Sequence, residues 1–311
     1  MTGQAATGRL AAARVGQVGI WSGALASATA ADARAAVGQM EALGYGAVWF
    51  GETPRLGREA FTHAGLLLAA THRMSVATGI ANIWLRHPAA AAAAAHTLAE
   101  AYPGRFVLGL GASHAAALSL VGGTYDKPLS AMRTYLGQMA EATYLGPAPE
   151  HPVPVVVAAL RHRMQELARD FADGMHSFFV DPAHTRAARA LLGPVPLLAP
   201  EQAVVVDADP DSARRRARKH VQSRLGLPNY VNNVRALGYS DQDLDGGGSD
   251  ALVDGLIAWG DAPTVAARIQ AHLDAGADHV AVHPLETRQD PFGLEQLATL
   301  APYVVPPAKA R

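Results

Sequence analysis

Short apolar runs alternate with longer stretches of helical periodicity along this chain of 311 residues. The strand-like runs are residues 15–21, 46–50, 74–80, 105–110, 153–158, 174–180, 195–206 and 278–283. The run at 195–206 contains Pro200, which leaves its assignment as a strand open. The runs are apolar throughout instead of alternating, which is typical of parallel strands buried on both faces. About eight such strand–helix units favour an α/β fold of the (β/α)8 TIM-barrel type over an open doubly wound sheet.

Helical spacing follows most of these runs. The predicted helices are residues 30–43, 59–71, 88–102, 128–144, 164–171, 182–192, 210–225 and 264–275. Before the last helix and strand, residues 226–260 form an insertion with a glycine-rich centre at residues 246–248. We interpret the insertion as a helical hairpin, which serves either as a packing or dimer contact or as a lid over the barrel mouth. The chain is otherwise expected to form a single domain, residues 1–311.

Composition narrows the class of partner. The formal net charge is −1 and no long basic run occurs, so we expect neither a nucleic acid nor a membrane as partner. The absence of cysteine excludes disulfides, thiolate zinc ligands and a cysteine nucleophile. The N-terminus lacks the pattern of a secretory signal, and the alanine-rich run 89–95 is too short to span a membrane. We therefore expect a cytoplasmic protein that acts on a small molecule.

Two titratable residues follow strand-like runs, where a TIM barrel places its functional side chains. Glu52 follows the second run and His114 follows the fourth. Both are candidates for general acid–base chemistry. Glu52 has a structural alternative, in which it caps the next helix or pairs with Arg55 or Arg58.

A metal site is the competing chemistry at this mouth. His87, His114 and His283 would join Glu52 if their strand ends converged. The chain contains neither an HxH nor an HExxH pair, and the ligand spacing is otherwise unspecific. We therefore predict no metal site.

Two glycines end the fourth run, in the sequence GLGASH at residues 109–114. A dinucleotide fold requires GxGxxG after its first strand, whereas His114 occupies the third glycine position here. We interpret Gly109 and Gly111 instead as clearance that lets the backbone approach a flat ring or a phosphate.

Five ordered stretches carry a family resemblance. They are GAVWFGE (46–52), VATGIANIWLRHP (76–88), YPGRFVLGLGASH (102–114), PVVVAALRHRMQELARDFADG (154–174) and AWGDAPTVAARIQAHLDAGADHVAVHP (258–284). With them the chain resembles the bacterial luciferase-like superfamily, and within it the oxidoreductases that use the deazaflavin coenzyme F420. In particular it looks like an actinobacterial subfamily of deazaflavin oxidoreductases without assigned substrates.

The resemblance implies a TIM barrel with F420 in its mouth, and commonly a homodimer. It also implies a cis peptide bond behind the cofactor ring, which would join Gly79 to Ile80 here. The positions that match the family's cofactor contacts are Gly79, Ile80, Asn82, Ala112, Ser113, Leu160, Arg161, Arg163 and Met164. The last four belong to a loop and a helix start that hold the cofactor phosphate.

The chain departs from related dehydrogenases at three places. Thr53 stands where relatives place a histidine base, and His114 stands where some place a glutamate. The phosphate loop, Gly-Gly-Pro in relatives, is Leu160-Arg161-His162. We expect an F420-dependent hydride transfer with His114 as the proton donor or acceptor. Glu52 would be the second such group or would orient the edge of the cofactor ring. The alternatives are an FMN-dependent luciferase-like monooxygenase and a degenerate barrel without catalytic activity.

Overall fold

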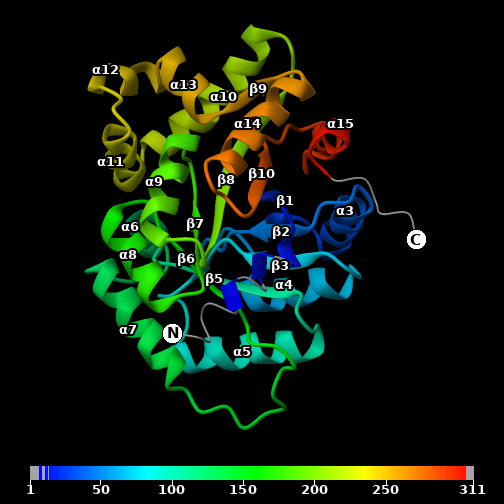
Figure 1. Cartoon of the computed structure of the whole chain (residues 1–311), viewed down its shortest axis with the longest axis vertical. Coiled ribbons are helices and arrows are strands. Elements are labelled where there is room, and N and C mark those ends of the chain that lie inside the picture. Colours follow the sequence, from blue (N-terminus) through cyan, green and yellow to red (C-terminus); the bar gives the residue numbers. More distant parts are fainter. Residues whose placement is uncertain (1–6, 9–10, 13, 306–311) are drawn as a thin grey trace.

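Eight parallel strands close into a barrel, which confirms the predicted fold class (Figure 1). The structure is a computed structural model that describes residues 7–8, 11–12 and 14–305. The outer limits of the predicted domain and the first residues of the chain, which the secretory-signal argument used, lie outside the described residues. The barrel strands are β1 (Val18–Trp21), β2 (Ala47–Phe50), β3 (Ser75–Thr78), β5 (Phe106–Gly111), β6 (Val155–Ala158), β7 (Gly174–Ser177), β8 (Leu197–Val206) and β10 (Val280–Pro284).

The barrel closes through β10, which pairs in parallel with both β1 and β8. Two short strands lie off this ring. They are β4 (Ala81–Asn82), which pairs with β5, and β9 (Ala258–Gly260), which pairs with β8.

Strand β8 runs without a break through Pro200, so the proline does not interrupt the strand. Pro200 lies opposite Ser177 of β7. A proline removes only its own N–H from the ladder. The rest of this ten-residue strand remains paired with β7, β9 and β10.

Helices surround the strands in Figure 1. They are α2 (Ala24–Ser27), α3 (Ala30–Ala42), α4 (Ala60–Ala69), α5 (Pro88–Ala101), α6 (Ala115–Ser119), α7 (Pro128–Ala140), α8 (His162–Phe171), α9 (Pro182–Leu192), α10 (Pro210–Leu225), α14 (Ala262–Asp274) and α15 (Leu294–Val304). The sequence did not predict α2, α6 or α15. Among the described residues, none of the helices has both the length and the apolar character needed to cross a bilayer.

Alternate residues of each strand pack into two apolar layers. On β2, Ala47 and Trp49 belong to the layer inside the barrel, whereas Val48 and Phe50 belong to the layer between strands and helices. Fully burying a side chain such as that of Val48 or Phe50 contributes roughly 1.5–3 kcal/mol to the stability of the fold. Because both faces of the strand are apolar, its sequence is a continuous apolar run.

The insertion is more divided than the predicted hairpin. It consists of α11 (Pro228–Ala236), α12 (Asp241–Leu244), a 3₁₀ turn at Asp245–Gly247 and α13 (Asp250–Leu256), followed by β9. Its apolar side chains, such as Tyr230 and Leu252, pack with Val221 of α10 and with Ala203 and Val205 of β8 in a second apolar core. Figure 1 shows α10 to α13 together at one end of the molecule.

Candidate functional site

A cavity of about 1100 Å³ opens at the C-terminal ends of the strands. The strand ends supply one part of its wall, and residues from the junction between α10 and α11 supply another. Ten of the predicted site residues line it, namely Glu52, Gly79, Ile80, Ala112, Ser113, His114, Leu160, Arg161, Arg163 and Met164. The structure therefore brings most of the predicted residues to one place.

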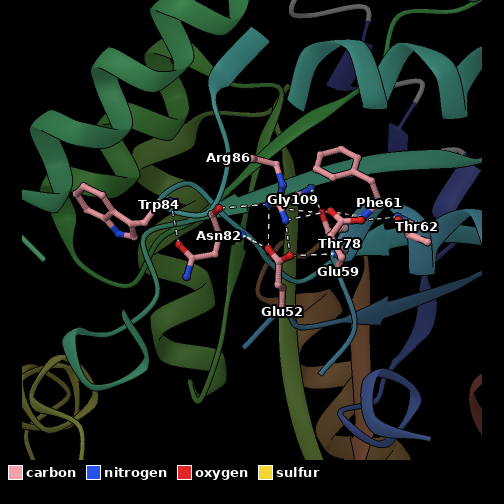
Figure 2. A network of polar contacts seen from close by, with 10 residues as sticks. Glu52, Glu59, Phe61, Thr62, Thr78, Asn82, Trp84, Arg86 and Gly109 are labelled. Carbon is pink, nitrogen blue, oxygen red and sulfur yellow. Dashed lines mark hydrogen bonds and ion pairs between the residues drawn. The ribbon is translucent and has the colours of Figure 1, made fainter. Parts of the chain in front are cut away.

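Glu52 is a buried carboxylate with four hydrogen-bond donors around it (Figure 2). Arg86 donates to both oxygens, at 2.9 Å from Nη1 to Oε2 and through Nη2 to Oε1. The backbone amide of Asn82 donates to Oε2 at 2.8 Å, and that of Ala60 donates to Oε1 at 3.1 Å. Burial acts to lower the pKa of Arg86, but its hydrogen bond and ion pair with Glu52 outweigh burial and raise the pKa.

These contacts connect the end of β2 to the start of α4 and to β4. The sequence alternative that Glu52 caps the next helix is confirmed by the Ala60 amide, but its partner is Arg86 and not Arg55 or Arg58. Arg55 donates to the carbonyl of Leu120, and Arg58 donates to that of Ala28.

The peptide bond between Gly79 and Ile80 is cis, as the resemblance implied. The carbonyl of Gly79 accepts a hydrogen bond from Trp21 Nε1 at 3.0 Å. The carbonyl of Ile80 accepts one from the Glu52 amide at 3.0 Å. Both residues of the cis bond line the cavity, and they are held by Trp21 of β1 and by Glu52, which follows β2.

The glycines of β5 have a different role from the one predicted. A Cβ on Gly109 would lie 1.8 Å from the carbonyl oxygen of Thr78, and one on Gly111 would lie 2.4 Å from Ile80 Cγ1. Neither glycine lines the cavity. The interpretation that they clear a cofactor ring is therefore wrong. They allow close packing of β5 against β3 and against Ile80.

Asn82 is buried beside the cavity and not among its lining residues. Its Oδ1 accepts a hydrogen bond from the amide of Trp84 at 3.1 Å (Figure 2). Its Nδ2 has no hydrogen-bond partner in the described part of the chain. This unpartnered donor lies two residues after the cis bond whose residues line the cavity.

His114 lies half-buried between the end of β5 and the insertion. Its Nδ1 is 2.9 Å from Asn229 Oδ1, and its ring centroid is 5.2 Å from that of Tyr230. The carbonyl of Asn229 only accepts, so Nδ1 carries the proton and Nε2 is left as an acceptor. Burial lowers the pKa of His114, the Asn229 hydrogen bond acts to raise it, and the charge of Arg224 lowers it further. The ring is therefore neutral at pH 7 and is suited to accept a proton.

Helix α8 begins at the cavity edge without a side-chain cap. The first amides of a helix have no acceptor within the helix, and the helix dipole makes this end favourable for an anion. Arg161 and Arg163 are exposed here, and neither forms an ion pair within the described residues. The carbonyl of Leu160 accepts hydrogen bonds from Gln165 and His184, which hold the loop in front of α8.

The sequence analysis missed several cavity residues. They are His176 and Phe178 near the end of β7, and Arg224, Asn229 and Tyr230 around the α10–α11 junction. His176 donates from Nδ1 to the carbonyl of Ala199 at 2.7 Å and stacks on Trp49 with ring centroids 4.8 Å apart. The histidine within the apolar strand GMHS was a readable signal, but no local signal marked the insertion residues.

The histidines of the metal alternative do not converge. His87 caps α5, because its Nδ1 accepts a hydrogen bond from the Ala89 amide at 3.2 Å. His114 faces Asn229 instead, and His283 pairs with Glu201.

The fold and the cavity together define a TIM-barrel protein with its site at the strand ends. A family model described as luciferase-like monooxygenase matches residues 11–279, and the chain belongs to this family. Its structure is similar to that of an F420-dependent secondary alcohol dehydrogenase in complex with an F420–acetone adduct. That likeness has a TM-score of 0.73 at 18% identity and covers 93% of this chain and 99% of the other.

Two further structures are similar across the whole fold. One is the coenzyme F420-dependent tetrahydromethanopterin reductase from Methanopyrus kandleri, with a TM-score of 0.70 at 17% identity, covering 94% of this chain and 99% of that one. The other is the oxygenating constituent of 3,6-diketocamphane monooxygenase from Pseudomonas putida in complex with FMN. It has a TM-score of 0.68 at 15% identity, covering 94% of this chain and all 100% of the other. At these identities the likeness shows the fold.

Proposed function

We propose that this protein is an oxidoreductase that binds coenzyme F420 in the cavity and exchanges a hydride with a small organic substrate. The observation that carries the proposal is the uncapped start of α8 at the cavity edge, with Arg161 and Arg163 beside it. This arrangement supplies free backbone amides and two positive charges, which suit a cofactor phosphate.

We propose that the strand-end part of the cavity wall holds the flat cofactor ring. Gly79, Ile80 and Ala112 line it, and the absence of a side chain on Gly111 gives Ile80 its place. The unpartnered Nδ2 of buried Asn82 provides a donor next to this wall. A bound deazaflavin would supply the hydride donor or acceptor, while these residues orient its ring and exclude water.

We assign proton transfer to His114. Its Nε2 is the free acceptor of a neutral ring whose other nitrogen is fixed by Asn229. In substrate oxidation, Nε2 takes the proton of the reacting hydroxyl, and in reduction the protonated ring returns it. Glu52, by contrast, has all its nearby donors in place, so we propose that it positions β4 and α4 instead of transferring a proton.

The rim of the cavity indicates the substrate class. Leu56 and Leu120 line it and are 66% and 39% exposed. Arg55 is held on the backbone of Leu120, which keeps the two loops together. We propose that the substrate presents an apolar body to this rim and one oxygen function to His114.

An activity assay separates this function from its alternative. The similarity to an FMN-bound monooxygenase makes FMN the second candidate. Under anaerobic conditions with a panel of secondary alcohols, we expect the protein to reduce F420, which is measured as a loss of absorbance of the oxidised cofactor. Oxygen consumption with reduced FMN, and no turnover with F420, would support the monooxygenase instead. A folded protein that binds neither cofactor would support a non-catalytic barrel.

A further inference from the structure

We propose that Glu201, His220 and His283 form a binding site for one divalent transition-metal ion of the zinc class. The three side chains come from β8, α10 and β10, so the ion would join α10 to the barrel wall. One donor atom from each residue lies within 4.8 Å of the other two. This separation is small enough for modest side-chain rotations to place all three on a single ion.

Glu201 and His283 lie close enough to become two neighbouring ligands. Glu201 Oε1 and His283 Nδ1 are 2.8 Å apart in a hydrogen bond, whose proton an ion would displace. Ligands bonded at about 2.0–2.2 Å in a tetrahedral site are roughly 3.4 Å apart, so the two atoms would separate by only about half an ångström. The other oxygen of Glu201 accepts the amide of Phe179 at 3.0 Å, which fixes the carboxylate in the way that outer contacts orient metal ligands.

His220 supplies the observation that a simple hydrogen-bond network leaves unexplained. Its Nε2 is buried and has no partner in the described part of the chain. Its ring lies edge-on to His283, with centroids 5.2 Å apart, and 6.2 Å from the ring of Phe179. A buried imidazole nitrogen without a partner is costly, and a metal ion at this position would satisfy it.

The donor set determines the chemistry of the ion. One carboxylate and two imidazoles form a set that binds zinc or ferrous iron and leaves positions open for water. Arg224, one helical turn after His220, reduces the affinity because its charge repels a cation. We therefore expect weaker binding than in a closed structural zinc site.

Metal binding would also affect the cavity wall, because His283 contacts aromatic residues that line the cavity. The ring of His283 lies 4.5 Å from that of Trp21 and 5.9 Å from that of Phe178, and both of these aromatic residues line the cavity. An ion at the three residues would therefore fix the aromatic side of the cavity as well as α10. Trp21 also gives the site a spectroscopic signal, because an open-shell ion nearby quenches indole fluorescence.

The test uses the tag-free full chain after treatment with a chelator. We expect Zn²⁺ and Co²⁺ each to bind one equivalent per chain, Co²⁺ to quench tryptophan fluorescence, and Zn²⁺ to raise the melting temperature. In His220→Gln the affinity should fall by at least about 100-fold. His63→Gln is the matched control, since His63 is a buried histidine of α4 that does not belong to the three-residue cluster.

Several results would overturn the proposal. Wild-type protein that binds no Zn²⁺ at a hundredfold excess over the chain would do so. Equal binding by wild type and His220→Gln would show adventitious binding to surface histidines only. If His220→Gln fails to fold, the Co²⁺ stoichiometry and fluorescence quenching of the wild-type chain still decide the question.

Discussion

The carboxylate of Glu52 and the guanidinium of Arg86 form a buried ion pair in which both carboxylate oxygens accept from the same arginine. Only 4% of the Glu52 side chain and 13% of the Arg86 side chain are exposed. Glu52 lines the cavity and Arg86 does not, and the pair connects β2, β4 and α4 through the two backbone amides that donate to Glu52.

Glu52→Ala should destabilise the fold by about 3–5 kcal/mol, because it removes the buried carboxylate that pairs with Arg86 and leaves only the exposed Glu59 as an ion-pair partner. Glu59→Gln is the comparison variant, since Glu59 contacts the same arginine from an exposed position and also caps α4, and we expect a loss of about 0.5–2 kcal/mol. Urea unfolding measures both. A Glu52→Gln variant with unchanged stability and no turnover would contradict the positioning role and restore Glu52 as a proton-transfer group.

His114 should give the reaction an acidic limb in its pH profile. Its pKa is lowered from 6.5, so the neutral base persists as the pH falls to 6.5 and is lost only below that value. We expect kcat/KM for substrate oxidation to be constant above pH 6.5 and to fall below it. His114→Gln should remove this limb and most of the turnover. In Asn229→Ala the ring loses its anchor, and activity should fall by about 10- to 100-fold with cofactor affinity unchanged. An unaltered profile in His114→Gln would exclude the residue.

The interior of the barrel should make the protein sensitive to acid. His279 donates from Nδ1 to the carbonyl of Gly16 and accepts from Trp49 Nε1 at 3.0 Å, so a second proton has no place on the ring. Burial lowers its pKa to about 4. Between pH 6.5 and about 4 the unfolded chain binds more protons than the folded chain. The free energy of unfolding therefore decreases as the pH is lowered through this window.

The loss from His279 alone approaches roughly 3 kcal/mol at the acid end of this window. Urea unfolding across the window measures it. The stability of His279→Gln, although lower at pH 7, should depend less on pH than that of the wild type. Identical slopes for the two proteins would show that His279 is not the titrating group.

The close packing around Gly109 predicts opposite effects on stability for two glycine-to-alanine substitutions. Gly109→Ala places a methyl group 1.8 Å from the Thr78 carbonyl oxygen, which forces β3 and β5 apart. We expect loss of several kcal/mol or failure to fold. Gly137→Ala, in the last turn of α7 with nothing within 4 Å of the new methyl, should stabilise the chain by about 0.5–1 kcal/mol. A folded Gly109→Ala protein of normal stability would contradict the packing role.

The fold was predictable because its signal is local. Each buried strand is a continuous apolar run, and helix starts such as Pro88 and Pro182 follow the ordinary preference for proline in the first turn. Pro200 left the strand assignment of residues 195–206 open in the sequence. Pairing with the neighbouring strands, and not the residue itself, decides that β8 continues through it.

The site was only partly predictable, because its contacts join distant residues. His114 and Asn229 are 115 positions apart, and Glu201 and His283 are 82 apart. No spacing rule connects such pairs. The resemblance supplied the cis bond and the start of α8, whereas the roles of Gly109 and Arg86 became visible only in the packed structure.

The central claim is that the α8 start and the strand ends hold a deazaflavin. Fluorescence titration of the purified protein with F420, and with FMN in parallel, tests it most directly. We predict one F420 site per chain, with affinity at least about 10-fold weaker in Arg161→Gln/Arg163→Gln and unchanged in the control Arg186→Gln on α9. Saturable binding that the double variant leaves intact, or a folded wild-type protein that binds no F420, would contradict the account.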